Sequence, residues 1–188
     1  MHEVIWHGRG GQGVVIAAQI LAESAYLQGF KGVTSAPTFG PERRGAPLTA
    51  STRISDAPIR TFSQIVQADI AVVLDPSLFG VVDILGSLKP EGLLLINTPQ
   101  NADEVEIRGC LGIATLDAAA VAIRFNLLNE GAPMVNTLML GVLSKASGLV
   151  SLDHLEKGLK WKLSGAVAAA NIAALRAAYE ETSIKRTE

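Results

Sequence analysis

Short apolar runs that alternate with helical stretches are the feature that most constrains this fold. Residues 70–74 and 92–96 are almost entirely apolar, which is typical of strands buried on both faces, and residues 113–116 form a weaker run. Asp75 and Pro76 follow the first of these runs and suit the N-cap and first position of a helix. The pattern predicts an α/β domain with a mostly parallel, Rossmann-like sheet flanked by helices.

The N-terminal third extends this pattern. Residues 4–7 and 32–36 are expected to be strands, and a helix is expected from 14 to 28, ended by Gly29. Residues 48–55 alternate between apolar and polar side chains, as a half-buried strand does.

The C-terminal part is expected to be helical. From Pro133 onward apolar residues recur at helix spacing, and the last helix is predicted to run from about Gly165 to Tyr179. The charged residues from Glu180 are predicted to form a frayed tail. No linker, repeat or low-complexity block is visible in the 188 residues, so one domain, 1–188, is expected.

The composition excludes several classes of protein. The chain is 48% hydrophobic and 18% charged, which suits a folded core. Its 16 basic and 18 acidic residues give a net charge of −2, without the long-range field of a nucleic-acid binder. The apolar windows are too short to span a bilayer, and no signal peptide is visible. A soluble, cytoplasmic protein with no nucleic-acid or membrane partner is expected.

The chain has few residues for metal or nucleophilic chemistry. Cys110 is the only cysteine, so this chain alone cannot form a disulfide or a cysteine-ligated iron–sulfur cluster. His2, His7 and His154 lie in distant segments and are interpreted as ordinary histidines. Neither a nucleophile elbow nor a P-loop lysine occurs, so no catalytic and no metal-ligating residue is predicted.

A glycine-rich turn joins the first predicted strand to the first predicted helix. Gly8, Gly10 and Gly13 fit the pattern G-x-G-x-x-G, which permits a sharp turn and suits an anion at the helix N-terminus. A dinucleotide site also needs an acidic residue on the second strand, and residues 32–36 contain none. A purely structural turn is therefore favoured over a nucleotide site. The candidate binding or interface residues of this turn are Arg9, Gly10, Gly11, Gln12 and Gly13.

A basic loop, PERRGAP at positions 41–47, is the second unusual feature. Guanidinium groups bind carboxylates and phosphates in a fork, so Arg43 and Arg44 could bind a substrate, a cofactor tail or a partner. The candidate binding or interface residues of this loop are Glu42, Arg43 and Arg44. A solvated loop, with an arginine paired to Glu42, stays open as the alternative. Both the glycine turn and this loop are expected near the carboxyl ends of the first strands, where open α/β sheets place their sites.

Taken together, these motifs resemble the gamma subunit of 2-oxoacid:ferredoxin oxidoreductases. The similarity covers nearly the whole chain in the same order. The ERRGAP form of the loop is more like the pyruvate and branched-chain members than the 2-oxoglutarate members, and enzymes for aromatic 2-oxoacids such as phenylglyoxylate stay open. The matching segments are HGRGGQG at 7–13, FGPERRGAP at 39–47, TRISD at 52–56, VLDP at 73–76, NTLMLG at 136–141 and GLV at 148–150.

This resemblance implies a heteromeric enzyme that converts a 2-oxoacid and coenzyme A to acyl-CoA and carbon dioxide. Thiamine diphosphate would lie between alpha and beta subunits, and iron–sulfur clusters, including those of a ferredoxin-like delta subunit, would carry the electrons. The gamma subunit would bind none of these groups alone. It would border the shared active site, with Arg43 or Arg44 facing another subunit or the coenzyme A phosphates. Ferredoxin and a nicotinamide cofactor both stay open as the final acceptor.

Two other functions stay open. A free-standing nucleotide-dependent oxidoreductase would bind flavin or nicotinamide tightly as an isolated chain, and the missing acid on residues 32–36 counts against it. A phosphate-recognising module would use Arg43 and Arg44 as a stable monomer with its own ligand. A subunit, by contrast, is expected to be sticky or unstable alone, because its interface is left exposed.

Overall fold

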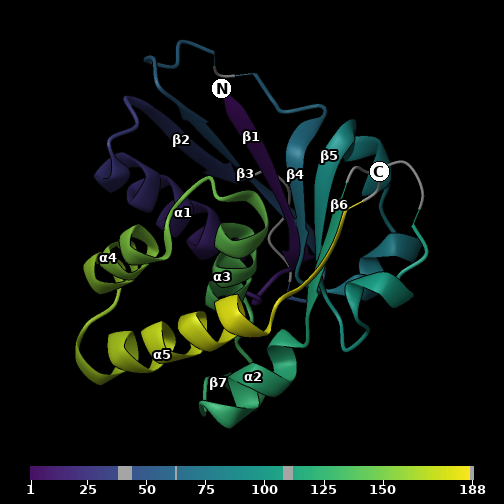
Figure 1. The fold of residues 1–188 in the computed structure, drawn as a ribbon, viewed down its shortest axis with the longest axis vertical. Coiled ribbons are helices and arrows are strands. Elements are labelled where there is room, and N and C mark those ends of the chain that lie inside the picture. Colours follow the sequence, from purple (N-terminus) through teal and green to yellow (C-terminus); the bar gives the residue numbers. More distant parts are fainter. Residues whose placement is uncertain (38–43, 62, 108–111, 187–188) are drawn as a thin grey trace.

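The computed structural model describes residues 1–37, 44–61, 63–107 and 112–186, which form one large sheet with helices packed against it (Figure 1). The order of the described strands is β2-β3-β1-β4-β5-β6-β9. Their bounds are β1 (His2–Arg9), β2 (Gly32–Pro37), β3 (Pro47–Ser55), β4 (Ala68–Val73), β5 (Leu88–Asn97), β6 (Gly112–Leu116) and β9 (Ser183–Arg186).

The central strands β1, β4, β5 and β6 pair in parallel. β3 lies between β1 and β2 and is antiparallel to both, while β9 is antiparallel to β6. The predicted α/β fold with a mostly parallel sheet is therefore confirmed. In a dinucleotide-binding fold the second strand lies beside the first and carries the acid that holds the ribose. Here β3 separates β1 from β2, so β2 does not lie beside β1 and cannot place such an acidic residue next to the glycine turn.

Helices α1, α3, α4 and α5 lie on one face of the sheet (Figure 1). With the sheet they enclose the main core, which includes Trp6, Leu95 and Leu138. The opposite face over β4 and β5 is covered by short 3-10 turns, among them Pro76–Gly80, where a helix is predicted. No described helix is long and apolar enough to cross a membrane. The helices are α1 (Val14–Gln28), α2 (Ala118–Arg124), α3 (Asn136–Ser147), α4 (Leu152–Lys162) and α5 (Gly165–Glu181).

The bounds of α1 follow from the glycines on either side of it. Gly13 has a φ of 74° and Gly29 a φ of 110°, left-handed conformations that glycine adopts at low cost. The Gly29 N–H donates to the carbonyl of Tyr26 at 3.0 Å, which satisfies one of the last helix carbonyls. The predicted helix from 14 to 28 is confirmed.

The predicted helical C-terminal part is confirmed by α3, α4 and α5, although α3 begins at Asn136 and not at Pro133. A short hairpin that the sequence did not predict precedes α3. β7 (Leu128–Asn129) and β8 (Ala132–Pro133) pair as a small antiparallel hairpin. Glu130 and Gly131 form its tip, with φ angles of 49° and 82°. Two left-handed residues in succession are the geometry that a two-residue hairpin needs.

The predicted frayed tail is also wrong. α5 continues to Glu181, and β9 then adds an edge strand beside β6. The Thr182 hydroxyl donates to the carbonyl of Ala178 at 2.6 Å, and the Ser183 hydroxyl accepts from the Ala102 N–H at 3.1 Å. These contacts hold the connection between helix and strand.

Candidate functional site

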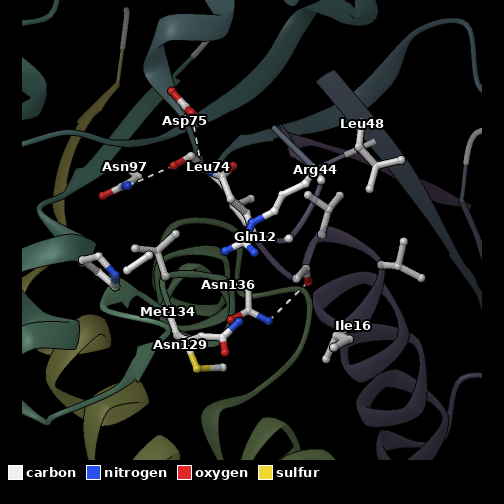
Figure 2. A pocket seen from close by; sticks show the side chains of 18 of the residues that line it. Gln12, Ile16, Arg44, Leu48, Leu74, Asp75, Asn97, Asn129, Met134 and Asn136 are labelled. Atoms are coloured by element: carbon white, nitrogen blue, oxygen red, sulfur yellow. Dashed lines mark hydrogen bonds between the residues drawn. The ribbon is translucent and has the colours of Figure 1, made fainter. Parts of the chain in front are cut away.

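A cavity of about 900 Å³ lies at the carboxyl ends of β1, β4 and β5, beside the N-terminus of α1 (Figure 2). Open α/β sheets usually bind their ligands at this position. The walls come from the glycine turn, the ends of β4 and β5, the segment from β7 to the start of α3, and residues 44–48, which lead into β3 and are called the basic arm below.

The cavity lining combines apolar walls, side-chain amides and a few charges. Such a surface suits a ligand that combines apolar parts, hydrogen-bonding groups and a charged group. Apolar side chains include Ile16, Leu48 and Met134, the amides are Gln12, Asn97, Asn129 and Asn136, and the charged side chains among the described lining residues are Arg44, Asp75 and Glu130.

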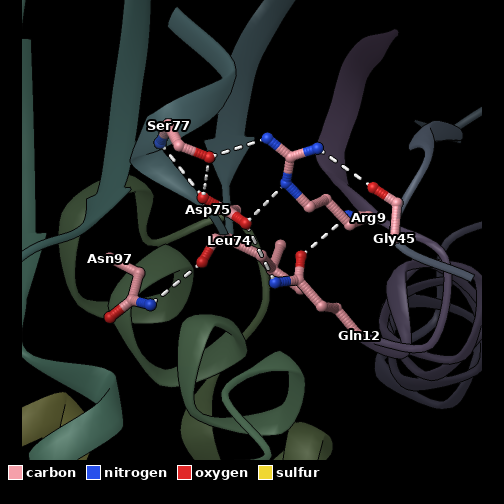
Figure 3. Close-up of polar contacts among 7 residues, drawn as sticks. All are labelled: Arg9, Gln12, Gly45, Leu74, Asp75, Ser77 and Asn97. Atoms are coloured by element: carbon pink, nitrogen blue, oxygen red, sulfur yellow. Dashed lines mark hydrogen bonds and ion pairs between the residues drawn. The ribbon is translucent and has the colours of Figure 1, made fainter.

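Asp75, which follows β4, is the centre of a polar network beside the cavity (Figure 3). Its Oδ2 accepts from Arg9 Nε at 2.9 Å and from Gln12 Nε2 at 3.2 Å. Its Oδ1 accepts from the N–H and the hydroxyl of Ser77 at 3.0 and 2.6 Å. Asp75 therefore is the predicted N-cap, and it also ties this turn to the glycine turn.

The protonation of Asp75 follows from these contacts. Burial alone would raise the pKa of its carboxyl group, but the hydrogen bonds from Ser77, Gln12 and Arg9 outweigh burial and leave the pKa lowered. The carboxylate is therefore ionised at neutral pH and surrounded by donors. It anchors the site and is a poor proton acceptor.

Arg9 points into this network. Its Nη1 donates to the carbonyl of Gly45 at 3.0 Å, and its Nη2 donates to the Ser77 hydroxyl at 2.8 Å. Gln12 Oε1 in turn accepts from the Arg9 N–H at 2.7 Å. Arg9 thus connects the strand ends to the basic arm, while Gln12 also lines the cavity.

The glycine turn is shaped by packing of the chain on itself. The Gly10 N–H donates to the Ala46 carbonyl at 2.9 Å, and the Gln12 N–H donates to the Arg9 carbonyl at 3.0 Å. A phosphate cradle would instead present such N–H groups to its ligand. A Cβ on Gly13 would lie 2.4 Å from Asn136 Nδ2, so α3 packs where only glycine fits. These contacts favour the structural interpretation of the turn.

Of the two candidate arginines of the basic loop, Arg44 is described by the structure and lines the cavity. Its backbone is held against the glycine turn by a bridge to Gly10, and the Gly45 N–H donates to the Gly10 carbonyl at 3.1 Å. The expected proximity of turn and loop is therefore confirmed for this part. The Arg44 side chain is 78% exposed and pairs with the carboxylate of Glu130. Glu42 and Arg43 lie outside the described residues.

Sequence reasoning did not identify Asn97, Asn129, Glu130 or Asn136 as residues of the site, although Asn136 begins the matching segment 136–141. Asn97 Nδ2 donates to the Leu74 carbonyl at 2.9 Å, and Asn136 Nδ2 donates to the Gly13 carbonyl at 3.2 Å. The position of Asn97 directly after a buried apolar run was a usable signal, because such positions face the ligand edge of the sheet. Glu130 gave no signal, since its hairpin is not predicted.

Comparison with known proteins decides the family. Residues 3–181 match the model of the pyruvate ferredoxin/flavodoxin oxidoreductase family. The chain is 46% identical over 187 residues to the common gamma subunit of the pyruvate/ketoisovalerate oxidoreductases of Pyrococcus furiosus, with 98% of each chain covered. The chain belongs to this oxidoreductase family. The resemblance to its gamma subunits, predicted from the motifs, is confirmed.

Two further relatives agree with this gamma-subunit family. The chain is 38% identical to the gamma subunit of the NADH-dependent phenylglyoxylate dehydrogenase of Aromatoleum evansii, covering 100% of this chain and 97% of that one. The crystal structure of the pyruvate oxidoreductase subunit PORC of Thermotoga maritima matches with a TM-score of 0.80 and 32% identity over 98% of both chains. Members that act on pyruvate and on phenylglyoxylate are therefore both among the relatives of this gamma subunit.

Proposed function

We propose that this gamma subunit works in a heteromeric enzyme that converts a 2-oxoacid and coenzyme A to acyl-CoA and carbon dioxide, and that its cavity holds part of coenzyme A. The observation that carries the proposal is the cavity at the strand ends with Arg44 at its rim. The acceptor of the electrons is ferredoxin or a nicotinamide cofactor reached through another subunit.

The chemistry of the lining supports coenzyme A as the occupant. Its pantetheine arm is thin, partly apolar and contains amide groups that can pair with Gln12, Asn97 or Asn136. The guanidinium of Arg44 can bind a phosphate through paired hydrogen bonds. The N-terminus of the 15-residue helix α1 adds a partial positive charge at the cavity wall.

Thiamine diphosphate and the iron–sulfur clusters are proposed to lie on alpha, beta and ferredoxin-like delta subunits. A cluster is usually held by four cysteine thiolates, and this chain has Cys110 alone, so its residues do not fit a cluster of their own. The gamma subunit then contributes packing and one wall of the shared active site. The assembly is proposed to work in the cytoplasm, without a nucleic-acid or membrane partner.

The proposal is tested by Arg44→Ala in the reconstituted complex. Loss of a charge-assisted contact to a phosphate should raise the KM for coenzyme A about tenfold, equivalent to about 1.4 kcal/mol, with the KM for the 2-oxoacid unchanged. Arg124→Ala is the matched control, because Arg124 forms an exposed ion pair with Glu181 outside this cavity. A smaller effect with 3′-dephospho-CoA would assign the contact to the 3′-phosphate, and an equal effect would assign it to the pyrophosphate.

The same variant separates the coenzyme A contact from a subunit contact. Subunit loss in native mass spectrometry, at an unchanged KM for coenzyme A in the complex that remains, would show that Arg44 binds a neighbouring chain. Unchanged kinetics with an intact complex would refute both roles.

A further inference from the structure

Glu130 occupies a backbone position that disfavours glutamate. It is at the first tip position of the β7–β8 hairpin and has a φ of 49°. Such turns prefer Gly, which has no Cβ to clash, and Asn or Asp, whose short side chains hydrogen-bond the nearby backbone. Glutamate has neither advantage in the left-handed conformation. The requirements of the turn therefore do not explain a glutamate at this position.

Fold stability does not explain this residue either. The Glu130 carboxylate pairs with Arg44, which is 86 positions away in the sequence, and the two side chains are 63% and 78% exposed. Ion pairs this exposed contribute little to the free energy of unfolding, because water and salt screen them. The pair connects two segments that both line the cavity, the basic arm and the hairpin.

Among the described residues that line the cavity, Arg44 is the only one with a positive charge. Its guanidinium already forms an ion pair with the Glu130 carboxylate. The third charged lining residue, Asp75, is already bound by Arg9, Gln12 and Ser77. Because the Glu130 carboxylate already accepts from Arg44 Nη2, an anion that binds Arg44 through this nitrogen competes with Glu130 for the hydrogen bond and for the positive charge.

We propose that Glu130 is a specificity-determining residue whose carboxylate yields Arg44 to a phosphate and withholds it from a monocarboxylate. A phosphate carries more charge and more acceptor oxygens than a carboxylate, so it gains more from the guanidinium. A 2-oxoacid offers only another carboxylate, and it competes with one that the hairpin already holds beside Arg44 at a high effective concentration. This inference rests on the proposed function, because it takes coenzyme A as the phosphate ligand and the 2-oxoacid as the competitor.

The test uses Glu130→Asn and Glu130→Gln in the reconstituted complex. Asparagine tolerates the left-handed turn and glutamine keeps the side-chain length, so an effect common to both variants reports the lost charge. The KM for coenzyme A should fall about threefold, which is the scale of an exposed ion pair. The 2-oxoacid should become an inhibitor competitive with coenzyme A at concentrations that leave the original enzyme unaffected.

Two controls make the result specific. Glu181→Asn removes the carboxylate of the matched Arg124–Glu181 pair and should change neither value. In the Arg44→Ala background, Glu130→Asn should have no further effect, because the carboxylate then has no cation to hold.

The outcomes separate this inference from the proposed function. If Arg44→Ala raises the KM for coenzyme A but neither Glu130 variant lowers it or admits 2-oxoacid inhibition, the role of Glu130 is refuted and the coenzyme A contact stands. If Arg44→Ala leaves the KM unchanged, the coenzyme A contact itself fails, and the inference fails with it.

Discussion

Arg9 and Asp75 join the ends of two adjacent parallel strands, with Arg9 Nε 2.9 Å from Asp75 Oδ2. Their side chains are 27% and 20% exposed, so this pair is shielded from solvent far more than the Arg44–Glu130 pair. Gln12 and Ser77 donate to the same carboxylate. The glycine turn, the end of β4 and the basic arm are thereby fixed relative to one another around the cavity.

Asp75→Asn should lower the free energy of unfolding at pH 7 by about 2 kcal/mol, because charge-assisted hydrogen bonds are lost. The pKa of Asp75 is lowered in the folded protein, so its stabilisation is present above the ordinary value of 3.8 and is lost as the pH falls below it. Urea unfolding at pH 7 and pH 3 measures this. The difference in the free energy of unfolding between Asp75→Asn and the original protein should shrink at pH 3. The control Asp56→Asn, at an exposed position, should change this free energy little at either pH. An equal difference at both values would contradict the account.

His7 should make the protein sensitive to mild acid. Burial lowers its pKa from 6.5 to about 4, because the charged imidazole is poorly solvated. The Ser87 hydroxyl donates its one proton to the Ile84 carbonyl, so toward His7 it can only accept, and His7 Nε2 is the donor. His7 Nδ1 is buried without a hydrogen-bond partner among the described residues.

Between pH 6.5 and 4 the unfolded chain therefore binds a proton that the folded chain does not, and the free energy of unfolding falls with the pH. The expected loss between pH 7.5 and 5 is roughly 2 kcal/mol. His7→Gln should abolish most of this slope in urea unfolding, while His154→Gln should preserve it. A slope that survives His7→Gln would place the titrating group elsewhere.

Gly13→Ala should destabilise the chain by about 3 kcal/mol, since it combines a φ of 74° with a Cβ placed 2.4 Å from Asn136 Nδ2. Gly148→Ala is the matched control. Its φ is 65°, but no heavy atom lies within 4 Å of the added Cβ, so backbone strain alone should cost about 1 kcal/mol. Thermal unfolding of both variants compares the two effects. Equal losses would show that α3 does not pack on Gly13 as described.

Removal of residues 183–188 should cost about 3 kcal/mol and promote aggregation. β9 pairs with β6 over four residues, and its loss leaves a parallel-sheet edge unpaired. Removal of 187–188 alone is the control, since β9 then stays. Thermal unfolding and light scattering measure the two effects, and equal behaviour of both truncations would contradict a stabilising role for β9.

Sequence patterns predicted the elements whose bounds depend on residues close together in the chain. Two glycines set the bounds of α1, the apolar runs identified β4, β5 and β6, and alternation identified β3. β9 escaped prediction because SIKR contains a single apolar residue, and only the free edge of β6 makes it a strand. The position of β3 between β1 and β2 is a long-range pairing that periodicity does not encode.

The candidate site was predicted only in part for the same reason. The glycine turn and Arg44 were identifiable by residue type, and the structure places both at the cavity. The inward direction of Arg9 depends on Asp75, which is 66 positions away. Glu130 reaches the site through a hairpin held by left-handed residues, and such φ angles in a glutamate are not readable from the sequence.

Purification of the tagged chain from its native host, with native mass and subunit identification, tests the central claim most directly. We expect recovery of a complex whose partner chains carry thiamine diphosphate and iron–sulfur clusters, and which oxidises a 2-oxoacid only when coenzyme A is present. A stable, lone monomer with a bound flavin or nicotinamide nucleotide would contradict the account and would identify the glycine turn as a cofactor site.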